Sequence, residues 1–231
     1  MLPIKGIQKT SLVDFPPNTG ATIFLGNCNF RCPFCQNPDL ITKFNETETI
    51  SETEIIEFLK SRKKWLDGVC ITGGEPLLYE LTEFLIKIKK IGMLIKLDTN
   101  GTNPERLKEL IEKKTVDYVA MDIKSSIEGY DESTKIKTDI EKIKKSVDIL
   151  KSNKVDYEFR MTVVPSLHSE EDFRKIGEWL KGSKRFFIQQ FNTKNCLDKD
   201  FEKIKPYPKE RLEIFRDILK KYIKEAEIRG V

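Results

Sequence analysis

The sequence lacks any long uncharged hydrophobic run. None of its 231 residues belongs to a stretch that approaches the roughly 18 consecutive apolar residues of a membrane span. The first six residues, 1–6, also lack the apolar segment of a signal peptide. We therefore expect a cytoplasmic protein that has no membrane partner.

The chain also carries little net charge. The chain has 41 Lys and Arg against 37 Asp and Glu, so its formal net charge is only +4. Nucleic acid is not expected as a partner, because binding to phosphates favours a strongly basic face. Hydrophobic residues make up 39% of the chain, which is enough for the core of a single domain of this length.

Histidine and cysteine are few. The one histidine is His168, and the five cysteines are an odd number in a chain without an export signal. A disulfide framework is therefore not expected. A structural zinc site usually has four ligands, often two cysteine pairs or added histidines. That composition is poorly matched here, although zinc stays open as an alternative.

Three of the cysteines, Cys28, Cys32 and Cys35, form a Cys-x-x-x-Cys-x-x-Cys motif. Iron–sulfur clusters are held by cysteine thiolates and usually by four of them. Three thiolates can hold three corners of a 4Fe–4S cube and leave the fourth iron open to a substrate or cofactor. Of the other two cysteines, Cys70 ends an apolar run and is expected to be buried, and Cys196 lies in a polar stretch without an assigned role.

Strand-like and helix-like segments alternate along the chain. Repeated strand–helix units predict a parallel sheet with right-handed crossovers. A complete eightfold barrel usually needs about 250 residues. We therefore predict an α/β fold, a partial TIM-type barrel of (β/α)6 type with a mostly parallel sheet and outer helices. It would form one domain over 1–231, with a core at about 20–192 and a C-terminal helix at about 208–228. The six strands are expected at 21–25, 68–72, 93–97, 117–121, 157–164 and 185–191.

Two local signals support the predicted helices. Ser51 with Glu54 three residues later is the pattern of a capping box at a helix N-terminus. Pro104 stands where the first turn of a helix tolerates proline.

Polar residues gather where the predicted strands end, which is where such sheets place their sites. The glycines of Gly73-Gly74-Glu75 permit close backbone approach to a ligand, or simply a tight turn, and Glu75 could accept from an ammonium group. Asp98 and Asp122 could bind ribose hydroxyls or a cation, although helix capping is the alternative.

Two basic residues belong to the same predicted edge. Lys124 could offset a carboxylate or lie on the surface. Arg160 falls within an apolar strand, where a lone charge is costly, so it needs a ligand carboxylate or an acidic neighbour.

Together these motifs resemble the radical S-adenosylmethionine superfamily. The resemblance is closest to the glycyl-radical-enzyme activases, first the anaerobic ribonucleoside-triphosphate reductase activating proteins and next pyruvate formate-lyase activase. The runs that carry it, besides the cysteine motif, are Thr10-Ser-Leu-Val-Asp-Phe-Pro16, Cys35-Gln-Asn-Pro38, Ile71-Thr-Gly-Gly-Glu-Pro-Leu77, Leu97-Asp-Thr-Asn-Gly101 and Met121-Asp-Ile-Lys124.

The resemblance implies an anaerobic oxidoreductase. Cys28, Cys32 and Cys35 would hold one 4Fe–4S cluster, whose open iron chelates S-adenosylmethionine. Reductive cleavage would give a 5′-deoxyadenosyl radical that takes a Cα hydrogen from a glycine of a partner glycyl-radical enzyme, such as ribonucleoside-triphosphate reductase. The electron donor would be of flavodoxin or ferredoxin type. Only 15 residues separate Cys35 from Ser51, so a second cluster is not expected.

The resemblance also implies the residues around the cofactor. Phe34 and Gln36 would flank the adenine, and Gly74 with Glu75 would meet the methionine ammonium. A monovalent cation shared by Asp98 and Asp122 is an open alternative. The expected cofactor-binding set is Phe34, Cys35, Gln36, Gly73, Gly74, Glu75, Asp98, Asn100, Asp122, Ile123, Lys124, Arg160 and Gln190.

One position departs from the family pattern. Formate-lyase activases have a histidine at the end of the last barrel strand, where this sequence has Gln189-Gln190, and His168 does not match that place. Two other functions stay open. One is a radical enzyme acting on a small molecule, such as a deazaguanine synthase, although the Gln-Gly-Glu run of that family is missing near the start. The other is a non-catalytic iron–sulfur or zinc protein.

Overall fold

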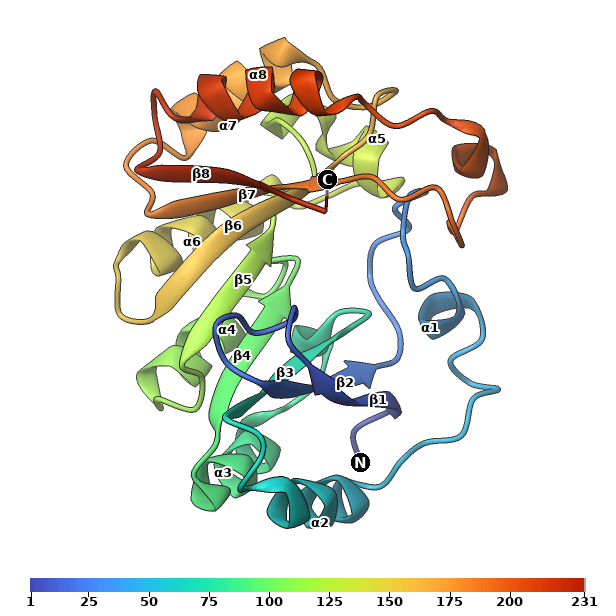
Figure 1. Cartoon of the computed structure of the whole chain (residues 1–231), viewed down its shortest axis with the longest axis vertical. Helices are drawn as coiled ribbons and strands as arrows, with labels where there is room; N and C mark the ends of the chain where they lie inside the picture. Colours follow the sequence, from blue (N-terminus) through green and yellow to red (C-terminus); the bar gives the residue numbers. More distant parts are fainter. Residues whose placement is uncertain (231) are drawn as a thin grey trace.

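The computed structural model describes residues 1–230, which form one curved sheet wrapped by helices (Figure 1). The strands lie in chain order across the sheet, with β1 antiparallel to β2 and all later neighbours parallel. Their bounds are β1 (Ile4–Ser11), β2 (Gly20–Leu25), β3 (Gly68–Gly73), β4 (Leu94–Thr99), β5 (Tyr118–Asp122), β6 (Asp156–Val163), β7 (Arg185–Gln190) and β8 (Glu225–Arg229).

The helices cover the outer, convex face of the sheet (Figure 1). The α-helices are α1 (Asp39–Thr42), α2 (Glu52–Arg62), α3 (Thr82–Ile91), α4 (Pro104–Glu112), α5 (Tyr130–Thr134), α6 (Ile140–Lys151), α7 (Glu170–Trp179) and α8 (Lys209–Leu219). Three short 3-10 helices lie at Pro76–Leu78, Ile127–Gly129 and Lys199–Lys203. None of the helices in residues 1–230 has the length and apolar character that a membrane crossing requires.

The predicted helix starts are confirmed. At α2 the backbone N–H of Glu54 donates to Ser51 Oγ, and the backbone N–H of Ser51 donates to the Glu54 carboxylate. These reciprocal bonds satisfy donors that a helix N-terminus leaves free. Pro104 is at the first turn of α4, after the capping residue Asn103. A second capping box, formed by Ser169 and Asp172 at α7, was not predicted.

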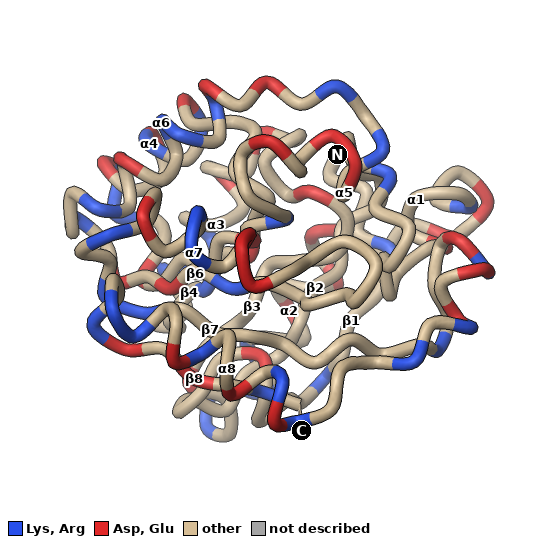
Figure 2. The backbone as a smooth tube through the Cα atoms, turned by 90° about the horizontal axis from the view of Figure 1, so that it is seen from above, with Lys and Arg blue, Asp and Glu red and all other residues tan. Residues whose placement is uncertain are grey.

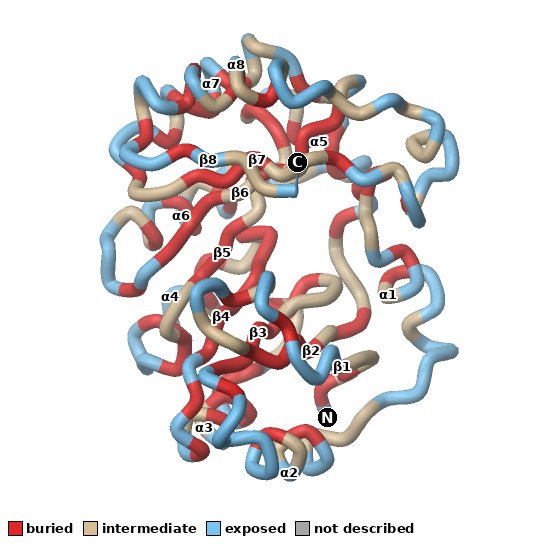
Figure 3. The backbone as a smooth tube through the Cα atoms, in the orientation of Figure 1, coloured by how far each residue is buried: buried red, intermediate tan, exposed pale blue. Residues whose placement is uncertain are grey.

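The core lies between the sheet and the helices. Burial is greatest along the strands and on the helix faces that look toward them (Figure 3). Apolar side chains such as Leu59, Leu85 and Leu107 are fully buried there. Charged side chains are buried as well: Asp98 lines the cavity within the curve of the sheet, Lys96 contacts Asp98, and Glu158 pairs with Arg229. Basic and acidic residues are interspersed along the outer helices (Figure 2).

The predicted fold class, α/β with a mostly parallel sheet and outer helices, is confirmed. The six predicted strands correspond to β2–β7, but the sheet has two further strands at its edges, β1 and β8. The predicted C-terminal helix at 208–228 is wrong beyond Leu219, where α8 ends. The chain then turns back at Tyr222 and enters β8, where the fully buried Ala226 pairs with Phe186 of β7. The predicted core of 20–192 was therefore too narrow.

The sheet is an open curve, with β1 at one edge and β8 at the other. Near the carboxyl ends of the strands, the two sides are joined by another contact. The backbone N–H groups of Leu197 and Asp198 donate to the carbonyls of Cys35 and Pro33, at 3.1 and 3.0 Å. The segment after β7 is thereby attached to the cysteine loop that follows β2.

Candidate active site

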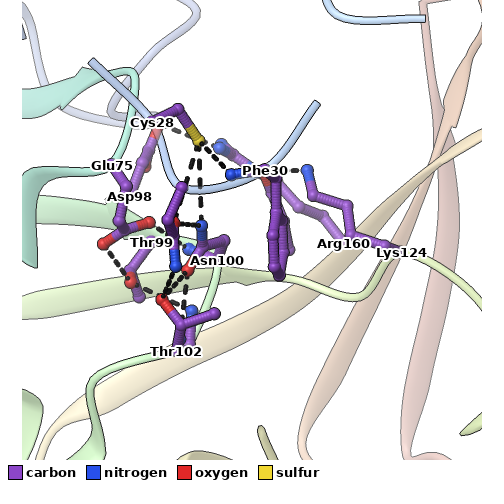
Figure 4. A network of polar contacts seen from close by, with 12 residues as sticks. Cys28, Phe30, Glu75, Asp98, Thr99, Asn100, Thr102, Lys124 and Arg160 are labelled. Atoms are coloured by element: carbon purple, nitrogen blue, oxygen red, sulfur yellow. Dashed lines mark hydrogen bonds and ion pairs between the residues drawn. The ribbon is translucent and has the colours of Figure 1, made fainter. Parts of the chain in front are cut away.

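A cavity of about 420 Å³ lies within the curve of the sheet, at the carboxyl ends of the strands. The cysteine loop forms one wall, and the polar side chains at the ends of β3–β6 form the others. The convergence predicted from the sequence is therefore found in the structure (Figure 4). The predicted site residues that line the cavity are Cys28, Cys32, Phe34, Cys35, Gln36, Gly73, Gly74, Glu75, Asp98, Asn100, Asp122, Lys124 and Arg160.

Two residues of the predicted set do not line the cavity. Ile123 is fully buried, and its backbone N–H donates to the carbonyl of Arg160 at 2.8 Å, so it joins β5 to β6. The side-chain amide of Gln190 donates to the Tyr207 carbonyl at 2.8 Å. Because side chains alternate along a strand, its neighbour Gln189 lines the cavity instead. The prediction that Gln190 lines the site is therefore wrong for this cavity, which Gln189 lines instead.

The three cysteine thiols share the wall of the cavity with apolar rings. Burial raises the pKa of Cys28 to about 12 and that of Cys32 to about 11, and it also raises the pKa of Cys35. The backbone N–H of Phe30 points at Cys28 Sγ, at 3.4 Å. Metal ligands must be thiolates, so a bound metal group has to supply the positive charge that displaces these protons. The buried rings of Phe30 and Phe34 limit water at the same wall.

The cysteine geometry bears on the choice between a cluster and a single zinc ion. Within residues 1–230, no three His, Cys, Asp or Glu side chains are grouped as the ligands of one ion. A 4Fe–4S cube binds each thiolate to a different iron, so its ligands need not converge on one point. The all-sulfur donor set, partly shielded from water, fits such a cluster better than a zinc ion.

The Gly-Gly-Glu turn packs directly against the cysteine loop. A Cβ atom on Gly74 would lie 1.7 Å from the carbonyl oxygen of Asn27, and Gly73 has a positive φ of 118°. The N–H of Gly74 donates to Leu25, and that of Glu75 donates to Asn27. The close approach that the glycines permit is therefore first of all an approach to the backbone of the chain itself.

Glu75 links this turn to the loop after β4. Its Oε1 accepts from the Leu77 N–H and the Thr99 hydroxyl at 2.9 and 2.8 Å, and its Oε2 accepts from the Asn100 N–H at 2.6 Å. Burial raises the pKa of Glu75 to about 7, although these hydrogen bonds oppose the shift. The Asn100 amide in turn donates to Asn29 Oδ1, in the cysteine loop, at 2.8 Å. Glu75 therefore helps to position the loop that carries Cys28.

A chain of ion pairs crosses the cavity. Lys124 contacts Asp122 at 3.0 Å, Arg160 contacts both Asp122 and Asp98, and Lys96 lies 2.9 Å from Asp98. Burial alone would raise the pKa of Asp122, but the charges of Arg160 and Lys124 hold that pKa far below its ordinary value. The acidic neighbours that Arg160 was expected to need are therefore Asp98 and Asp122. Within this group three cations face two carboxylates, and the carboxyl groups of Asp14 and Glu75 line the same cavity.

The same ion pairs account for every carboxylate oxygen of the two aspartates. Each carboxylate oxygen of Asp98 and Asp122 has a side-chain nitrogen of Arg160, Lys96 or Lys124 within 3.0 Å. The guanidinium of Arg160 thus lies between the two carboxylates, to which the sequence had assigned a shared monovalent cation as an open alternative. Asp98 Oδ1 contacts Lys96 only as an ion pair and has no aligned hydrogen-bond donor within residues 1–230, so it can still accept a neutral hydroxyl group.

His168 lies beside the site and holds neighbouring backbone in place. Its Nδ1 accepts from the Val164 N–H at 2.9 Å, so the proton is on Nε2, which lies 2.9 Å from the Lys124 carbonyl. Burial lowers the pKa of His168 to about 4, and the ring is therefore neutral at physiological pH. It packs edge-on against Phe34. The histidine fixes the loop that carries Lys124.

Sequence reasoning missed several residues of the cavity. Thr162 lies two positions after Arg160 on β6 and shares its face, a signal that strand alternation could have revealed. Asp14 comes from the loop between β1 and β2. Its carbonyl accepts from Lys96 at 2.5 Å, and its carboxylate accepts from Thr22 at 2.6 Å. No local signal placed Asp14 there, because the antiparallel pairing of β1 was not predicted.

Comparisons with known proteins agree with this geometry. The radical SAM superfamily profile matches residues 22–180. A protein from Methanocaldococcus jannaschii named as a glycyl-radical enzyme activating enzyme is 38% identical over 236 residues, covering 99% of this chain and 96% of its own. The pyruvate formate-lyase-activating enzyme of Clostridium pasteurianum is 30% identical, covering 96% of this chain and 97% of its own.

Two solved structures share the fold. A domain of a pyruvate-formate lyase-activating enzyme from Bacteroides vulgatus has a TM-score of 0.58 at 18% identity, covering 71% of this chain and 99% of that one. Streptococcus suis SuiB has a TM-score of 0.68 at 15% identity, covering 89% of this chain and 47% of that one. At these identities the structures support the fold alone. With the profile match over most of the chain and two relatives aligned over nearly their whole length, this chain belongs to the radical SAM superfamily, in the family of the glycyl-radical enzyme activating enzymes.

Proposed function

We propose that this chain activates a glycyl-radical enzyme by removing a hydrogen atom from a glycine Cα of that partner. The observation that carries the proposal is the placement of Cys28, Cys32 and Cys35 in one wall of a cavity whose other walls bear Asp98, Asp122, Lys124 and Arg160. The end-to-end similarity to two activating enzymes supports the same function. The partner class we propose is an anaerobic ribonucleoside-triphosphate reductase.

The cysteines would hold a single 4Fe–4S cluster through three of its irons. When bound, the reduced cluster supplies the electron that splits S-adenosylmethionine into methionine and a 5′-deoxyadenosyl radical. The aromatic rings of Phe24, Phe30 and Phe34 line the cavity and would exclude water from that chemistry.

The remaining residues would bind and orient S-adenosylmethionine. The cationic side chains of Lys124 and Arg160 line the cavity and would attract the methionine carboxylate. Asp98 Oδ1 would accept from a ribose hydroxyl, since it has no aligned donor within the described chain. Of the two glutamines at the end of β7, Gln189 lines the cavity, and its amide would supply the hydrogen bond that formate-lyase activases make with a histidine. The electron donor would be a protein of flavodoxin or ferredoxin type.

Anaerobic reconstitution with iron and sulfide tests the proposal. We expect about four irons per chain from a single 4Fe–4S cluster. Dithionite and S-adenosylmethionine should then give 5′-deoxyadenosine, measured by chromatography. Mixing with candidate reductases should give a glycyl doublet in electron paramagnetic resonance.

A Cys32→Ala variant is the control and should lose both signals. Tetrahedral zinc at the three cysteines, without any reducible cluster, would overturn the proposal. Formation of 5′-deoxyadenosine without a glycyl signal from any candidate partner would instead favour a small-molecule substrate.

A further inference from the structure

The carboxylates of Asp98 and Asp122 are close enough to destabilise each other. They lie at the ends of the neighbouring strands β4 and β5, and the charge of Asp122 acts to raise the pKa of Asp98. Two buried like charges cannot both stay ionised unless a cation compensates them. Whether that cation is a side chain or a metal ion decides whether the cavity depends on the salt in the solution.

The strand register brings Arg160 to both carboxylates. Arg160 pairs with Asp122 across β5 and β6, while Asp98 on β4 pairs with Ala120 on β5. Ala120 therefore separates Asp98 from β6, and its small side chain leaves the guanidinium room to reach across. Arg160 Nη2 lies 3.0 Å from Asp98 Oδ2, and Arg160 Nε contacts Asp122 Oδ1. Because a guanidinium is planar and presents several N–H groups, it can bridge two acceptors that face it from different strands.

The outer carboxylate oxygens have partners as well. Lys96 lies 2.9 Å from Asp98 Oδ1, and Lys124 lies 3.0 Å from Asp122 Oδ2. Three cations, Lys96, Lys124 and Arg160, already face the two carboxylates, so a metal cation added between them would bring a further positive charge against these side chains. Burying an uncompensated charge is costly.

We propose that Arg160 is a built-in replacement for a metal cation between Asp98 and Asp122, so that the cavity is organised independently of sodium or potassium. Arg160 acts here as a positioning residue, because it holds the two carboxylates in place. Ala120 is the second requirement, since a larger side chain would block the reach of the guanidinium.

The test compares the reconstituted full-length protein in sodium, potassium and tetramethylammonium chloride at equal ionic strength. The first readout is the thermal unfolding midpoint without S-adenosylmethionine, which does not depend on the proposed function. The second is the dissociation constant for S-adenosylmethionine from equilibrium dialysis, which rests on that function. For the wild-type protein we expect equal midpoints and dissociation constants within about twofold in all three salts.

The Arg160→Gln variant removes the bridging charge and keeps a polar, though shorter, side chain. We expect its midpoint to be several degrees higher in sodium or potassium than in tetramethylammonium, and its affinity for S-adenosylmethionine to depend on the metal salt by tenfold or more. Arg160→Lys keeps the charge but not the planar fork, so its salt dependence should be smaller than that of Arg160→Gln. The matched control is Arg174→Gln on the outer face of α7, where the same charge is removed far from the carboxylates.

Either of two results would overturn the inference. One is a wild-type protein whose midpoint or affinity requires sodium or potassium, and this measurement needs no variant. The other is a folded Arg160→Gln variant that behaves alike in all three salts. If Arg160→Gln does not fold, Ala120→Val provides the variant arm, since the added methyl groups narrow the path of the guanidinium and should introduce the same salt dependence.

Discussion

Gln36 and Asn192 are joined by a hydrogen bond, although 156 positions separate them in the chain. The side-chain amide of Gln36 donates to the Asn192 carbonyl at 2.8 Å, and the same amide nitrogen lies 3.8 Å from Cys196 Sγ. Together with the backbone bonds from Leu197 and Asp198, this contact fastens the cysteine loop to the segment after β7. The free side of the cysteine loop is thus supported by the C-terminal part of the chain.

We expect Gln36→Leu to loosen the cluster without unfolding the protein. One hydrogen bond is worth about 1 kcal/mol, so global stability should change little. The cysteine loop, however, loses its side-chain attachment to residue 192, and an iron chelator should remove the cluster several-fold faster. The absorbance of the cluster under anaerobic conditions measures the rate. Gln8→Leu, on the exposed part of β1, is the control, and equal rates in the two variants would contradict the prediction.

Gly74→Ala should disrupt the site. The new Cβ would overlap the Asn27 carbonyl oxygen, so the turn and the cysteine loop must move apart. We expect a loss of about 3 kcal/mol in unfolding free energy and poor iron incorporation, because overpacking forces backbone shifts. Chemical unfolding and iron analysis measure the two effects. Gly6→Ala is the matched control, since its Cβ meets nothing closer than 3.8 Å, and an equal loss in both variants would show that the overlap is unimportant.

The sequence was most informative where the signal is local. The capping box of Ser51 and Glu54, the strands β2–β7 and the cysteine motif all depend on residues close together in the chain. The two edge strands do not. The exposed middle of β1 carries no clear alternation, and β8 has five residues of which three are charged, so only their partners in the sheet make them strands.

The site shows the same limit at the scale of one residue. A one-residue uncertainty in strand position exchanges the two faces, which is why Gln190 rather than Gln189 was placed in the cavity. Arg160 was recognised as needing a charged partner, but its distance to Asp98 depends on the register of three strands. Glu75 was expected to meet the cofactor from its place in the motif. Its three hydrogen bonds to Leu77, Thr99 and Asn100 could not be predicted, because they depend on how two loops pack.

The buried neutral His168 should make stability depend on pH. Its pKa is about 4 in the folded chain against 6.5 when exposed. As pH falls below 6.5, the imidazole therefore becomes protonated in the unfolded chain but stays neutral in the folded chain. The free energy of unfolding should therefore fall by about 2 kcal/mol between pH 7 and pH 5 from this group alone. Below the folded pKa no further loss is expected from it.

Comparison with His168→Gln isolates that contribution, because glutamine does not titrate and can still donate to the Lys124 carbonyl. Urea unfolding of the cluster-free, thiol-reduced protein at each pH keeps the acid lability of the cluster out of the measurement. The stability advantage of the wild type over the variant should shrink as pH falls from 7 to 5. A constant difference across that range would mean that the ring is not held neutral.

The ion pair between Arg229 and Glu158 should anchor the last strand. Arg229 on β8 donates to both oxygens of the buried Glu158 on β6, at 2.7 and 3.0 Å, and the Tyr118 hydroxyl donates to the same carboxylate at 2.8 Å. Arg229→Met leaves that carboxylate buried without its cation, which typically costs about 3 kcal/mol. The double variant Glu158→Gln/Arg229→Met should recover much of the loss, because the neutral amide can still accept from Tyr118. Urea unfolding of both single variants and the double variant measures the coupling, and simple additivity of their losses would show that the pair does not hold β8 in place.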